Sequence, residues 1–518
     1  MAQTVKYPIG IQSFESIRED GFLYVDKTAL IYQLVNKSKF VFLSRPRRFG
    51  KSLLLTTIKS YFEGRRDLFK GLAMDTLEHD WTVHPVFLID LNVGNYFDPE
   101  ALEKRLNYIL SNYEDTYGRK DDAKSTGDRF TYLLKRASEL TGRKAVVLID
   151  EYDKPILHNI HNVELLERFR AELQSFYSVL KSSDNDIRFA MLTGVTKIGK
   201  LSIFSGLNNI EDISLQPAYG TLCGITRQEL LDNCADGISS LAAEEGLSVD
   251  GALEQLRKEY DGYSFTKAMQ RVYNPFSLVS AIKSRQFNHF WYSTGTTTLL
   301  VNLLRERDYD LENLEGIVVD GSRLADVDVA FNDVVPVIFQ TGYLTIKDYD
   351  REMGEYTLGF PNREVADGFV KDLLPTYGRR NLSSEFSTGK FVRDLRGGDA
   401  EAFMRRLQAF LADVPYEVAR VREVHFHNAM YLMCKLVGFY VNAEYRTSDG
   451  RIDLVLKTDR FIYVIECKID RSPEEALAQI DDKGYLLPFA ADGRKLYKIG
   501  VNFSTERRRL DGFLIKEA

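Results

Sequence analysis

The sequence predicts an α/β protein that contains a parallel β-sheet with helices on both faces and, near its C-terminal end, a second α/β domain. In the first half of the chain, short apolar segments alternate with longer segments of helical periodicity. The apolar segments are rich in Val, Ile, Leu and Phe, as strands buried on both faces of a parallel sheet usually are. Near the C-terminal end, two strand-like runs flank a short polar loop. Both patterns are typical of layered α/β domains.

The N-terminal elements follow one another in a regular order. Runs such as "KFVFLS" and "KAVVLIDEYD" read as strands, and a helical segment follows each of the first three. We expect strands at residues 39–44, 85–91, 144–153 and 187–194, and helices at 51–62, 99–117 and 162–182. Strands that alternate with helices in this way predict a parallel sheet in the first domain.

The middle of the chain has a different pattern. Residues 226–304 are mostly helical, whereas 331–375 read as a helix ending at Gly342, a hairpin across the turn "REMG", and another helix. This order suits a winged-helix-like module, and it suits a helical lid on the first domain equally well. Residues 393–401, which are rich in Gly and charge, read as a linker or a helix junction. The predicted domains are therefore 1–225, 226–400 and 401–518.

Composition and charge restrict the class of function. The chain has 518 residues, of which 44% are hydrophobic and 28% charged, and its formal net charge is −7. A protein that coats DNA constitutively would be basic, so any contact with nucleic acid must use a local patch or be gated. The four cysteines have no metal-binding spacing and predict reduced thiols. Without a signal peptide or an apolar run long enough for a membrane helix, we expect a soluble, cytoplasmic protein that does not associate with membranes.

The stretch "FLSRPRRFGKSLLL" predicts a phosphate-binding loop of the Walker A type. An apolar strand enters it and a helical segment leaves it, and such a loop binds phosphate through backbone N–H groups and a helix N-terminus. Gly50 allows the backbone to approach closely, Lys51 is the phosphate lysine, and Ser52 is a Mg²⁺ ligand. Arg45 stands where the usual motif has its first glycine, so we expect Pro46, with its fixed φ, to form that turn.

A second buried strand supplies the carboxylates that a nucleotide site of this kind requires. "VVLIDE", of the Walker B type, ends in Asp150, expected to orient Mg²⁺, and Glu151, expected to polarise the attacking water. An acidic strand end is common in ordinary sheets, but the two motifs in order, about 100 residues apart, favour a nucleotide site. The strand "FAMLTG" then places Thr193 where a polar residue can sense the γ-phosphate, and Lys197 follows as a charge donor or a solvated lysine.

The segments "YPIGIQSFESIREDGFLYVDKTALI", "RPRRFGKSL", "VVLIDEYDKPI" and "MLTGVTKI" resemble the AAA-ATPase-like family of bacterial P-loop proteins, over residues 5–220. In that family this arginine-rich form of the loop is usual. The resemblance implies an ATP site and a role near the nucleotide for "DKT" at 26–28, which from the residues alone is a turn-and-cap pattern. We also expect the loop arginines to place positive charge beside the phosphates. The expected nucleotide-binding residues are Arg45, Pro46, Arg47, Arg48, Phe49, Gly50, Lys51, Ser52, Asp150 and Thr193, with Ser52 and Asp150 at the metal.

The run "GRIDLVLKTDRFIYVIECK" predicts a hairpin with a charged site. If Lys457 pairs with Ile462, the register places Asp453 directly opposite Glu466, and a one-residue slip would separate them. Lys468 shares the face of Glu466 in any register because side chains alternate along a strand. Two carboxylates and a lysine on one face suit Mg²⁺-dependent phosphodiester hydrolysis. The alternative, an ordinary cross-strand charge cluster, is disfavoured because opposed like charges and charges in an apolar strand are costly.

The spacing Asp-x12-Glu-x-Lys resembles the PD-(D/E)XK nuclease superfamily over residues 415–505, although Ile452 stands in place of the motif's proline. The helix that begins after Ser472 would carry Gln479 back toward the site. The resemblance implies Asp453, Glu466, Lys468 and Gln479 as catalytic residues, and Glu423, Asp453 and Glu466 as metal ligands.

The two sites together predict an ATP-binding and ATP-hydrolysing protein coupled to a Mg²⁺-dependent nuclease that cuts nucleic acid, DNA in the first instance, under nucleotide control. The resemblance to the AAA-ATPase-like family also implies a role in defence or mobile-element control. One alternative is a nucleotide-dependent switch or scaffold with little or no catalysis. Another is a transcriptional protein that binds nucleic acid through the winged helix. This alternative is disfavoured because that region is not basic and would make few phosphate contacts. The sequence leaves open whether the chain forms a homo-oligomer or binds a protein partner.

Overall fold

The computed structural model describes residues 5–198, 210–291, 298–307, 309–328, 332–377, 388–411, 423–438, 442–448, 451–507 and 509–518. The chain folds into two compact units. Unit 1 comprises Met1–Gly295 and Gly316–Glu364, and unit 2 comprises Thr296–Glu315 and Val365–Ala518. The three domains drawn from the sequence, with their two boundaries, stay predictions.

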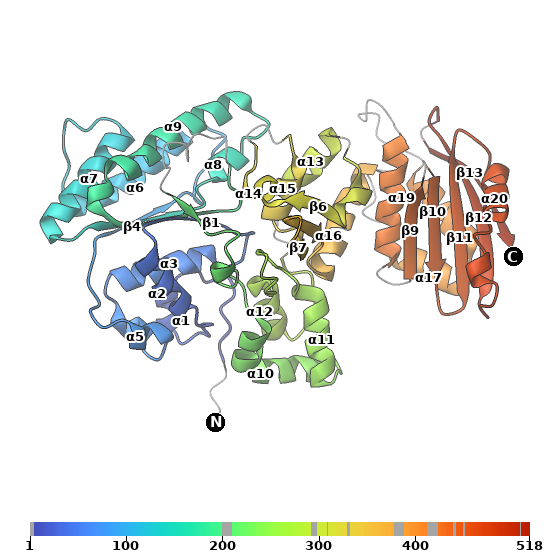
Figure 1. The fold of residues 1–518 in the computed structure, drawn as a ribbon, viewed down its shortest axis with the longest axis horizontal. Coiled ribbons are helices and arrows are strands. Elements are labelled where there is room, and N and C mark those ends of the chain that lie inside the picture. Colours follow the sequence, from blue (N-terminus) through green and yellow to red (C-terminus); the bar gives the residue numbers. More distant parts are fainter. Residues whose placement is uncertain are drawn as a thin grey trace. The chain divides into compact units, whose positions relative to one another are not determined.

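Unit 1 is built on a five-stranded parallel sheet with the strand order β2-β3-β4-β1-β5 (Figure 1). The strands are β1 (Phe40–Ser44), β2 (Val86–Asp90), β3 (Ala145–Asp150), β4 (Ile187–Gly194) and β5 (Glu211–Asp212). All four pairings are parallel. Both β1 and β3 are buried along their whole length, which is why they read as continuous apolar runs in the sequence.

Helices cover both faces of this sheet, as Figure 1 shows. On one face, α6, α7 and α9 enclose a core that includes Phe42, Ile89 and Leu192 from the strands. The helix α3 packs against β2, β3 and β4. The helices of this part are α1 (Phe14–Glu19), α2 (Thr28–Lys37), α3 (Lys51–Phe62), α4 (Arg66–Phe69), α5 (Ala73–Leu77), α6 (Ala101–Tyr117), α7 (Thr126–Thr141), α8 (Lys154–Leu157) and α9 (Val163–Ser182).

The strand order determines where a ligand can bind. The chain leaves β1 for the β2 edge of the sheet, and after β4 it crosses to β5 on the opposite edge. Open α/β sheets bind ligands beyond the carboxyl ends of their strands, at the point where the direction of winding reverses. The carboxyl ends of β1, β3 and β4 are Ser44, Asp150 and Gly194, so this edge is where a site is expected.

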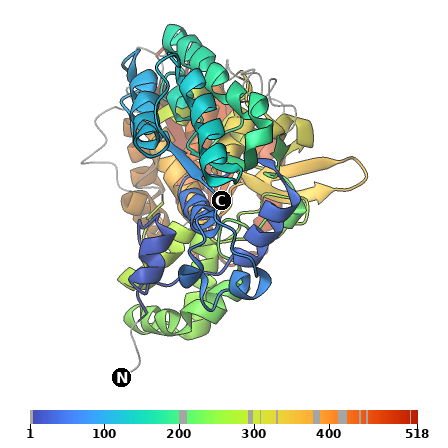
Figure 2. The same ribbon diagram turned by 90° about the vertical axis from the view of Figure 1, so that its left-hand side faces the viewer.

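The rest of unit 1 is helical, apart from a small antiparallel sheet with the order β6-β8-β7. We name residues 317–328 and 332–359 the wing module; its β7–β8 hairpin projects clear of the neighbouring helices in Figure 2. The helix–hairpin–helix order of a winged-helix-like region is present, and β6 adds a third strand. The elements are α10 (Arg227–Glu244), α11 (Val249–Tyr260), α12 (Pro275–Ser284), β6 (Ile317–Asp320), α14 (Gly321–Ala325), α15 (Val334–Gln340), β7 (Thr345–Asp350) and β8 (Glu355–Gly359). The helix that follows the hairpin, α16 (Arg363–Tyr377), begins at the end of unit 1 and belongs mostly to unit 2.

Unit 2 contains a mixed five-stranded sheet in the order β13-β12-β11-β10-β9. Only β11 and β12 run parallel, and the other pairs are antiparallel. Helix α20 packs on one face through Leu477 and Ile480, against Ile462 and Val464 of β11. The remaining elements are α13 (Thr298–Glu306), α17 (Thr388–Gly397), α18 (Ala400–Phe410), α19 (Glu423–Gly438), β9 (Asn442–Ser448), β10 (Arg451–Lys457), β11 (Phe461–Ile469), α20 (Pro473–Asp482), β12 (Lys495–Ser504) and β13 (Arg509–Glu517).

The predicted strands and helices are confirmed with small shifts of boundary, and several elements were not predicted, among them α1, α2, α4, α5, α7 and α8. The predicted helix at 51–62 and strand at 187–194 have the observed bounds, and the stretch at 393–401 is a helix junction. Helix α7 went unpredicted although Ser125 and Asp128 form a capping box at its start, a signal that the sequence carries. Within the described part of the chain, none of the helices combines the length and the apolar character that a bilayer span needs.

Gly342, which follows α15, offers a test of how the wing module packs on the phosphate-loop segment. Its φ is +91°, and a Cβ atom added there would lie 2.6 Å from the Cβ of Pro46. Gly342→Ala should therefore lower the free energy of unfolding by about 1–3 kcal/mol more than Gly354→Ala, because overpacking adds to the strain of a positive φ. Gly354 also has a positive φ but no atom within 4 Å of an added Cβ. Urea unfolding followed by the fluorescence of Trp81 and Trp291, both in unit 1, measures the difference.

Candidate active sites

The segment that joins β1 to α3 has the backbone of an anion-binding loop. Gly50 has a φ of +90° and Arg48 a φ of +66°, so two residues adopt the left-handed conformation that favours glycine. Helix α3 begins at Lys51 and has no side-chain cap. Such a helix N-terminus can direct N–H groups and its dipole toward a bound anion. The local geometry therefore suits phosphate, although Arg45 stands in place of the first glycine.

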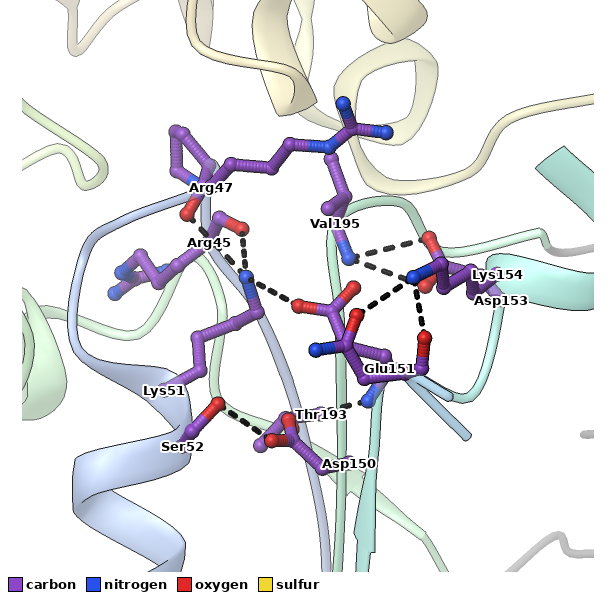
Figure 3. A network of polar contacts seen from close by, with 12 residues as sticks. Arg45, Arg47, Lys51, Ser52, Asp150, Glu151, Asp153, Lys154, Thr193 and Val195 are labelled. Carbon is purple, nitrogen blue, oxygen red and sulfur yellow. Dashed lines mark hydrogen bonds and ion pairs between the residues drawn. The ribbon is translucent and has the colours of Figure 1, made fainter. Parts of the chain in front are cut away.

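The amino group of Lys51 is buried at the centre of this loop, as Figure 3 shows. Nζ donates hydrogen bonds to the carbonyl oxygens of Arg45, at 3.1 Å, and Pro46, at 3.3 Å. It also lies 3.5 Å from Oε1 of Glu151. The lysine is 4% exposed, so these three oxygen atoms compensate a charge that has little access to water. A phosphate that enters the loop would compete with them for the same amino group.

Asp150 joins three elements at the carboxyl edge of the sheet. Its Oδ2 accepts a hydrogen bond from the Ser52 hydroxyl of α3 at 2.5 Å, and its Oδ1 accepts one from the Thr193 hydroxyl of β4 at 2.7 Å. Burial raises the pKa of Asp150 above its ordinary value; the hydrogen bond from Ser52 opposes this shift and the charge of Glu151 adds to it. A hydroxyl and a carboxylate in contact are oxygen donors of the type that Mg²⁺ prefers, so the residues present fit that ion.

Glu151 follows directly in a strained backbone conformation. Its φ is +54°, which is uncommon for a residue with a side chain and recurs at functional sites. The next residue holds the turn, because the N–H of Tyr152 donates to the Thr193 carbonyl at 3.0 Å. This turn brings the Glu151 carboxylate close to Lys51 rather than continuing the direction of the strand.

The Arg45 side chain lies elsewhere than expected. Its guanidinium donates to the carbonyls of Ser44 at 2.9 Å, Ser214 at 2.8 Å and Tyr219 at 3.2 Å, and it stacks on Phe265, 4.4 Å from the ring centroid. It points away from Lys51 in Figure 3 and is 2% exposed. Burial lowers its pKa to about 10. These contacts indicate that Arg45 fixes the loop to residues 214–219 and that only its carbonyl faces the phosphate lysine.

The rest of the loop packs against the helical part of unit 1. Phe49 is buried between Tyr263 and Phe265, with ring centroids 4.7 and 5.4 Å away. The Arg48 guanidinium lies 4.1 Å from the Phe276 ring centroid. The Arg47 carbonyl accepts a hydrogen bond from the Trp291 indole at 3.0 Å. The phosphate-loop segment is thus held from the side of residues 263–291 as well as by the sheet.

In unit 2 the predicted hairpin register is confirmed. Lys457 pairs with Ile462, and Asp453 pairs with Glu466 across antiparallel β10 and β11. Directly opposed residues of an antiparallel pair project to the same face. Tyr463 belongs to the opposite face, where its hydroxyl donates to the Leu395 carbonyl of α17 at 2.7 Å.

Glu466 and Lys468 lie together beneath α20. The Glu466 side chain is 1% exposed, and the Lys468 amino group lies 3.4 Å from its Oε1. Lys468 also donates a hydrogen bond to Oε1 of Gln479 on α20. Ser472 caps α20 by accepting the Glu475 N–H at 3.2 Å, as the sequence predicts. The helix thus brings Gln479 to the lysine, which neither periodicity nor spacing could establish alone.

The remaining predicted metal ligands of unit 2, the side chains of Glu423 and Asp453, lie outside the described residues, although their backbones begin α19 and pair in β10. Among the side chains that are described, no three His, Cys, Asp or Glu residues come together in a metal-holding group. The donor set that the strand register implies, two carboxylates on one face beside a lysine, fits a divalent cation.

Two family models match the chain. One, described as "Predicted AAA-ATPase", matches residues 8–204, and one for the PD-(D/E)XK nuclease superfamily matches residues 421–512. A protein of Azotobacter chroococcum mcd 1, named "Uncharacterized protein in vnfD 5'region", is 36% identical over 523 residues, which cover 99% of both chains. The chain belongs to the AAA-ATPase-like family. Its second matched region is of the PD-(D/E)XK superfamily, so the two resemblances drawn from the sequence are confirmed, and both regions are of hydrolase type.

One buried residue of this AAA-ATPase-like protein was missed in the sequence. Asp153, in "DEYD", is fully buried, and its Oδ2 accepts hydrogen bonds from the Thr196 N–H at 2.7 Å, the Thr196 hydroxyl at 2.8 Å and the Val195 N–H at 3.1 Å. It therefore ties the turn that carries Glu151 to the segment after β4. A Cβ at Gly194 would lie 2.6 Å from Oδ1 of Asp153, so this approach requires glycine. In the sequence, an acidic residue shortly after a buried strand is a common pattern, so it did not indicate that Asp153 would bind the segment after β4.

The "DKT" segment connects three helices of unit 1. Asp26 accepts hydrogen bonds from the Thr28 N–H at 2.8 Å and from the Ala73 N–H of α5 at 2.8 Å. Lys27 pairs with Glu229 of α10 at 2.6 Å. The contacts join α2 to α5 and α10, which agrees with the turn-and-cap pattern; the role near the nucleotide that the family resemblance implies stays a prediction.

The pH dependence of stability tests the burial of Asp153. Burial, with the charge of Glu151, raises its pKa from 3.8 to about 6. Because the folded-state pKa is the higher one, the ionised carboxylate costs stability above pH 6, and protonation removes this cost as the pH falls toward 4. The free energy of unfolding of the wild type should therefore rise relative to that of Asp153→Asn by about 1–3 kcal/mol between pH 7 and pH 4.5. Urea unfolding at several pH values measures this, and a constant difference would contradict it.

Proposed function

We propose that this AAA-ATPase-like protein binds and hydrolyses ATP at the carboxyl edge of its parallel sheet and cleaves nucleic acid phosphodiesters with its PD-(D/E)XK domain. The convergence of Lys51, Ser52, Asp150 and Glu151 at one strand edge supports the first activity. The pairing of Asp453 with Glu466, next to Lys468, supports the second. Nucleic acid, DNA in the first instance, is the proposed substrate, and defence or mobile-element control in the cytoplasm is the role in keeping with the family.

For ATP hydrolysis, the loop and Lys51 would bind the phosphates. Lys51 would exchange its contact with Glu151 for phosphate oxygens, which frees the Glu151 carboxylate to orient the attacking water. Thr193, whose hydroxyl bonds to Asp150, would respond to the state of the γ-phosphate. Ser52 and Asp150 would hold Mg²⁺, which neutralises phosphate charge when it is bound.

For phosphodiester cleavage, the carboxylates of Glu423, Asp453 and Glu466 would hold Mg²⁺, which supplies electrophilic stabilisation of the phosphate when it is bound. Lys468 would stabilise the negative charge that develops at the scissile phosphate. Gln479 accepts a hydrogen bond from Lys468 and so orients the amino group. The Glu466 side chain is 1% exposed, so little water screens its contact with Lys468, which strengthens that contact.

Nucleotide control fits the charge of the protein better than constitutive nucleic-acid binding does. The net charge is −7, and the hairpin at 345–359 carries four acidic residues and two basic ones. Such a wing gives few phosphate contacts, which argues against a transcriptional role for the winged-helix-like region. A nucleotide-dependent switch with little catalysis is the alternative, favoured by the Lys51–Glu151 contact, which occupies the two groups that turnover needs.

Lys51→Ala should reduce ATP hydrolysis by about 10²-fold or more and weaken nucleotide binding, because the phosphate charge loses its buried cation. Lys59→Ala is a matched control on the same helix, since Lys59 pairs with Glu63 at the surface. Phosphate release and titration with a fluorescent ATP analogue measure the two effects. Binding without hydrolysis by the wild type would favour the switch, and equal rates for both variants would contradict the site.

Asp453→Ala and Lys468→Ala should each lower nucleic acid cleavage by about 10²-fold or more, because each removes a group that acts on the reacting phosphate. Asp459→Ala, in the loop between β10 and β11, is the matched control. Labelled single- and double-stranded DNA and RNA are incubated with Mg²⁺, with and without ATP. Cleavage that survives Asp453→Ala, or that is unchanged by chelation of Mg²⁺, would overturn the assignment.

A further inference from the structure

The end of β4 and the segment that follows it link the proposed ATP site to the wing module. Thr193, whose hydroxyl contacts Asp150, and Gly194 end the strand, and the segment runs on from Val195 to Ile198. On the side of the sheet, the carboxylate of Asp153 holds the N–H groups of Val195 and Thr196. A displacement of this segment would therefore move Thr193 and the Glu151 turn together, because Tyr152 also bonds to Thr193.

On its other side, the segment is held by Gln340, the last residue of α15. The Lys197 N–H donates to Oε1 of Gln340 at 2.7 Å. Nε2 of Gln340 donates to the carbonyls of Leu324 at 2.7 Å and Ala325 at 3.1 Å, at the end of α14. The side chain is 6% exposed, and its acceptor and both donors are used. Because both the oxygen and the nitrogen of this buried amide are hydrogen-bonded, the side chain has one orientation. Gln340 therefore fixes the distance between the segment after β4 and the end of α14.

Two further contacts support this link. The Val327 N–H donates to the Lys197 carbonyl at 2.7 Å, and Ile198 and Val327 form a parallel bridge. The Lys197 amino group pairs with Asp212 at 2.9 Å and with Asp326 at 3.2 Å. The Lys197 amino group thus joins β5 to the wing module, a structural contact that neither of the two roles drawn from the sequence includes.

The same end of α15 also touches the phosphate-loop segment. Gly342, two residues after Gln340, leaves no room for a Cβ atom against Pro46. A small cavity nearby is lined by Arg45 and Pro46 of the loop and by Phe339 and Gln340 of α15, among others. Positions 340 and 342 therefore contact the two segments that a bound γ-phosphate would rearrange, and β7 begins only three residues later.

We propose that Gln340 is a positioning residue for ATP hydrolysis and that it couples the state of the ATP site to the wing module. The proposal rests on the proposed ATPase function and adds its regulation. When the γ-phosphate engages the loop and Thr193, the segment at 194–198 shifts, and Gln340 transmits the shift to α14, α15 and the β7–β8 hairpin. Coupling of this kind is reciprocal for binding, so whatever binds the wing module changes nucleotide affinity by the same factor.

Gln340→Leu tests the proposal because it removes the acceptor and both donors while keeping a side chain of similar size. We expect the kcat of ATP hydrolysis to fall by about tenfold, within the usual range of coupling between sites, with nucleotide Kd changed less than about threefold. Gln340→Glu keeps the acceptor for the Lys197 N–H but places a negative charge against two carbonyl oxygens. It should also lower kcat while changing the nucleotide Kd little. Gln228→Leu, at an exposed glutamine of α10 that bonds to Asp232, is the matched control and should match the wild type.

Hydrogen exchange of the full-length protein, with and without Mg²⁺ and a non-hydrolysable ATP analogue, gives a readout that a purely structural role would not affect. In the wild type, peptides spanning residues 334–344 and 345–359 should change protection when the analogue binds, and this change should be lost in Gln340→Leu although the analogue still binds. Binding without a wild-type response, or wild-type kcat and exchange in Gln340→Leu, would overturn the coupling alone. A wild type that binds no nucleotide would overturn the proposed ATPase function, and the coupling with it.

Discussion

Asp150 accepts hydrogen bonds from Ser52 and Thr193, and this three-way contact organises unit 1. It exists because β4 lies between β1 and β3 in the sheet, so the phosphate-loop helix and the β4 end meet at one carboxylate. The cost of burying that carboxylate is offset only while both hydroxyls remain in place. Any change in the loop or in the segment after β4 therefore alters the environment of Asp150, and through it the adjacent Glu151 turn.

The surroundings of the loop show why an arginine can occupy the position of its first glycine. The Arg45 guanidinium turns back into the protein and satisfies three carbonyl oxygens, while its own carbonyl accepts from Lys51. Phe49 and Arg48 pack on aromatic rings of residues 263–276. The glycine-poor loop is thus stabilised by packing from outside, which joins the conformation of the phosphate site to the helical part of unit 1 and, through α15, to the wing module.

In unit 2 a different constraint acts, because a carboxylate and an ammonium interrupt an otherwise apolar strand. Glu466 is buried next to Lys468, and Gln479 of α20 holds the amino group from above. A buried ion pair alone contributes little net stability, since desolvation offsets the Coulomb attraction. Its presence on the face that Asp453 also occupies is better explained by chemistry than by folding, which is the basis of the proposed nuclease function.

The sequence by itself determined strands β1 to β4, the β7–β8 hairpin, several of the helices, the register of β10 and β11 and both families, because these follow from local periodicity, caps and motif spacing. Helix α7 was missed although its capping box is local. The turn of the Arg45 guanidinium back into the protein was not expected, because no local pattern specifies which distant carbonyl a side chain meets. Only the tertiary structure showed that Asp153 clamps the β4 exit and that Gln340 reaches it from 143 residues away in sequence. Such contacts depend on the order of the strands and on the packing of segments that are far apart in the sequence. Local periodicity encodes neither.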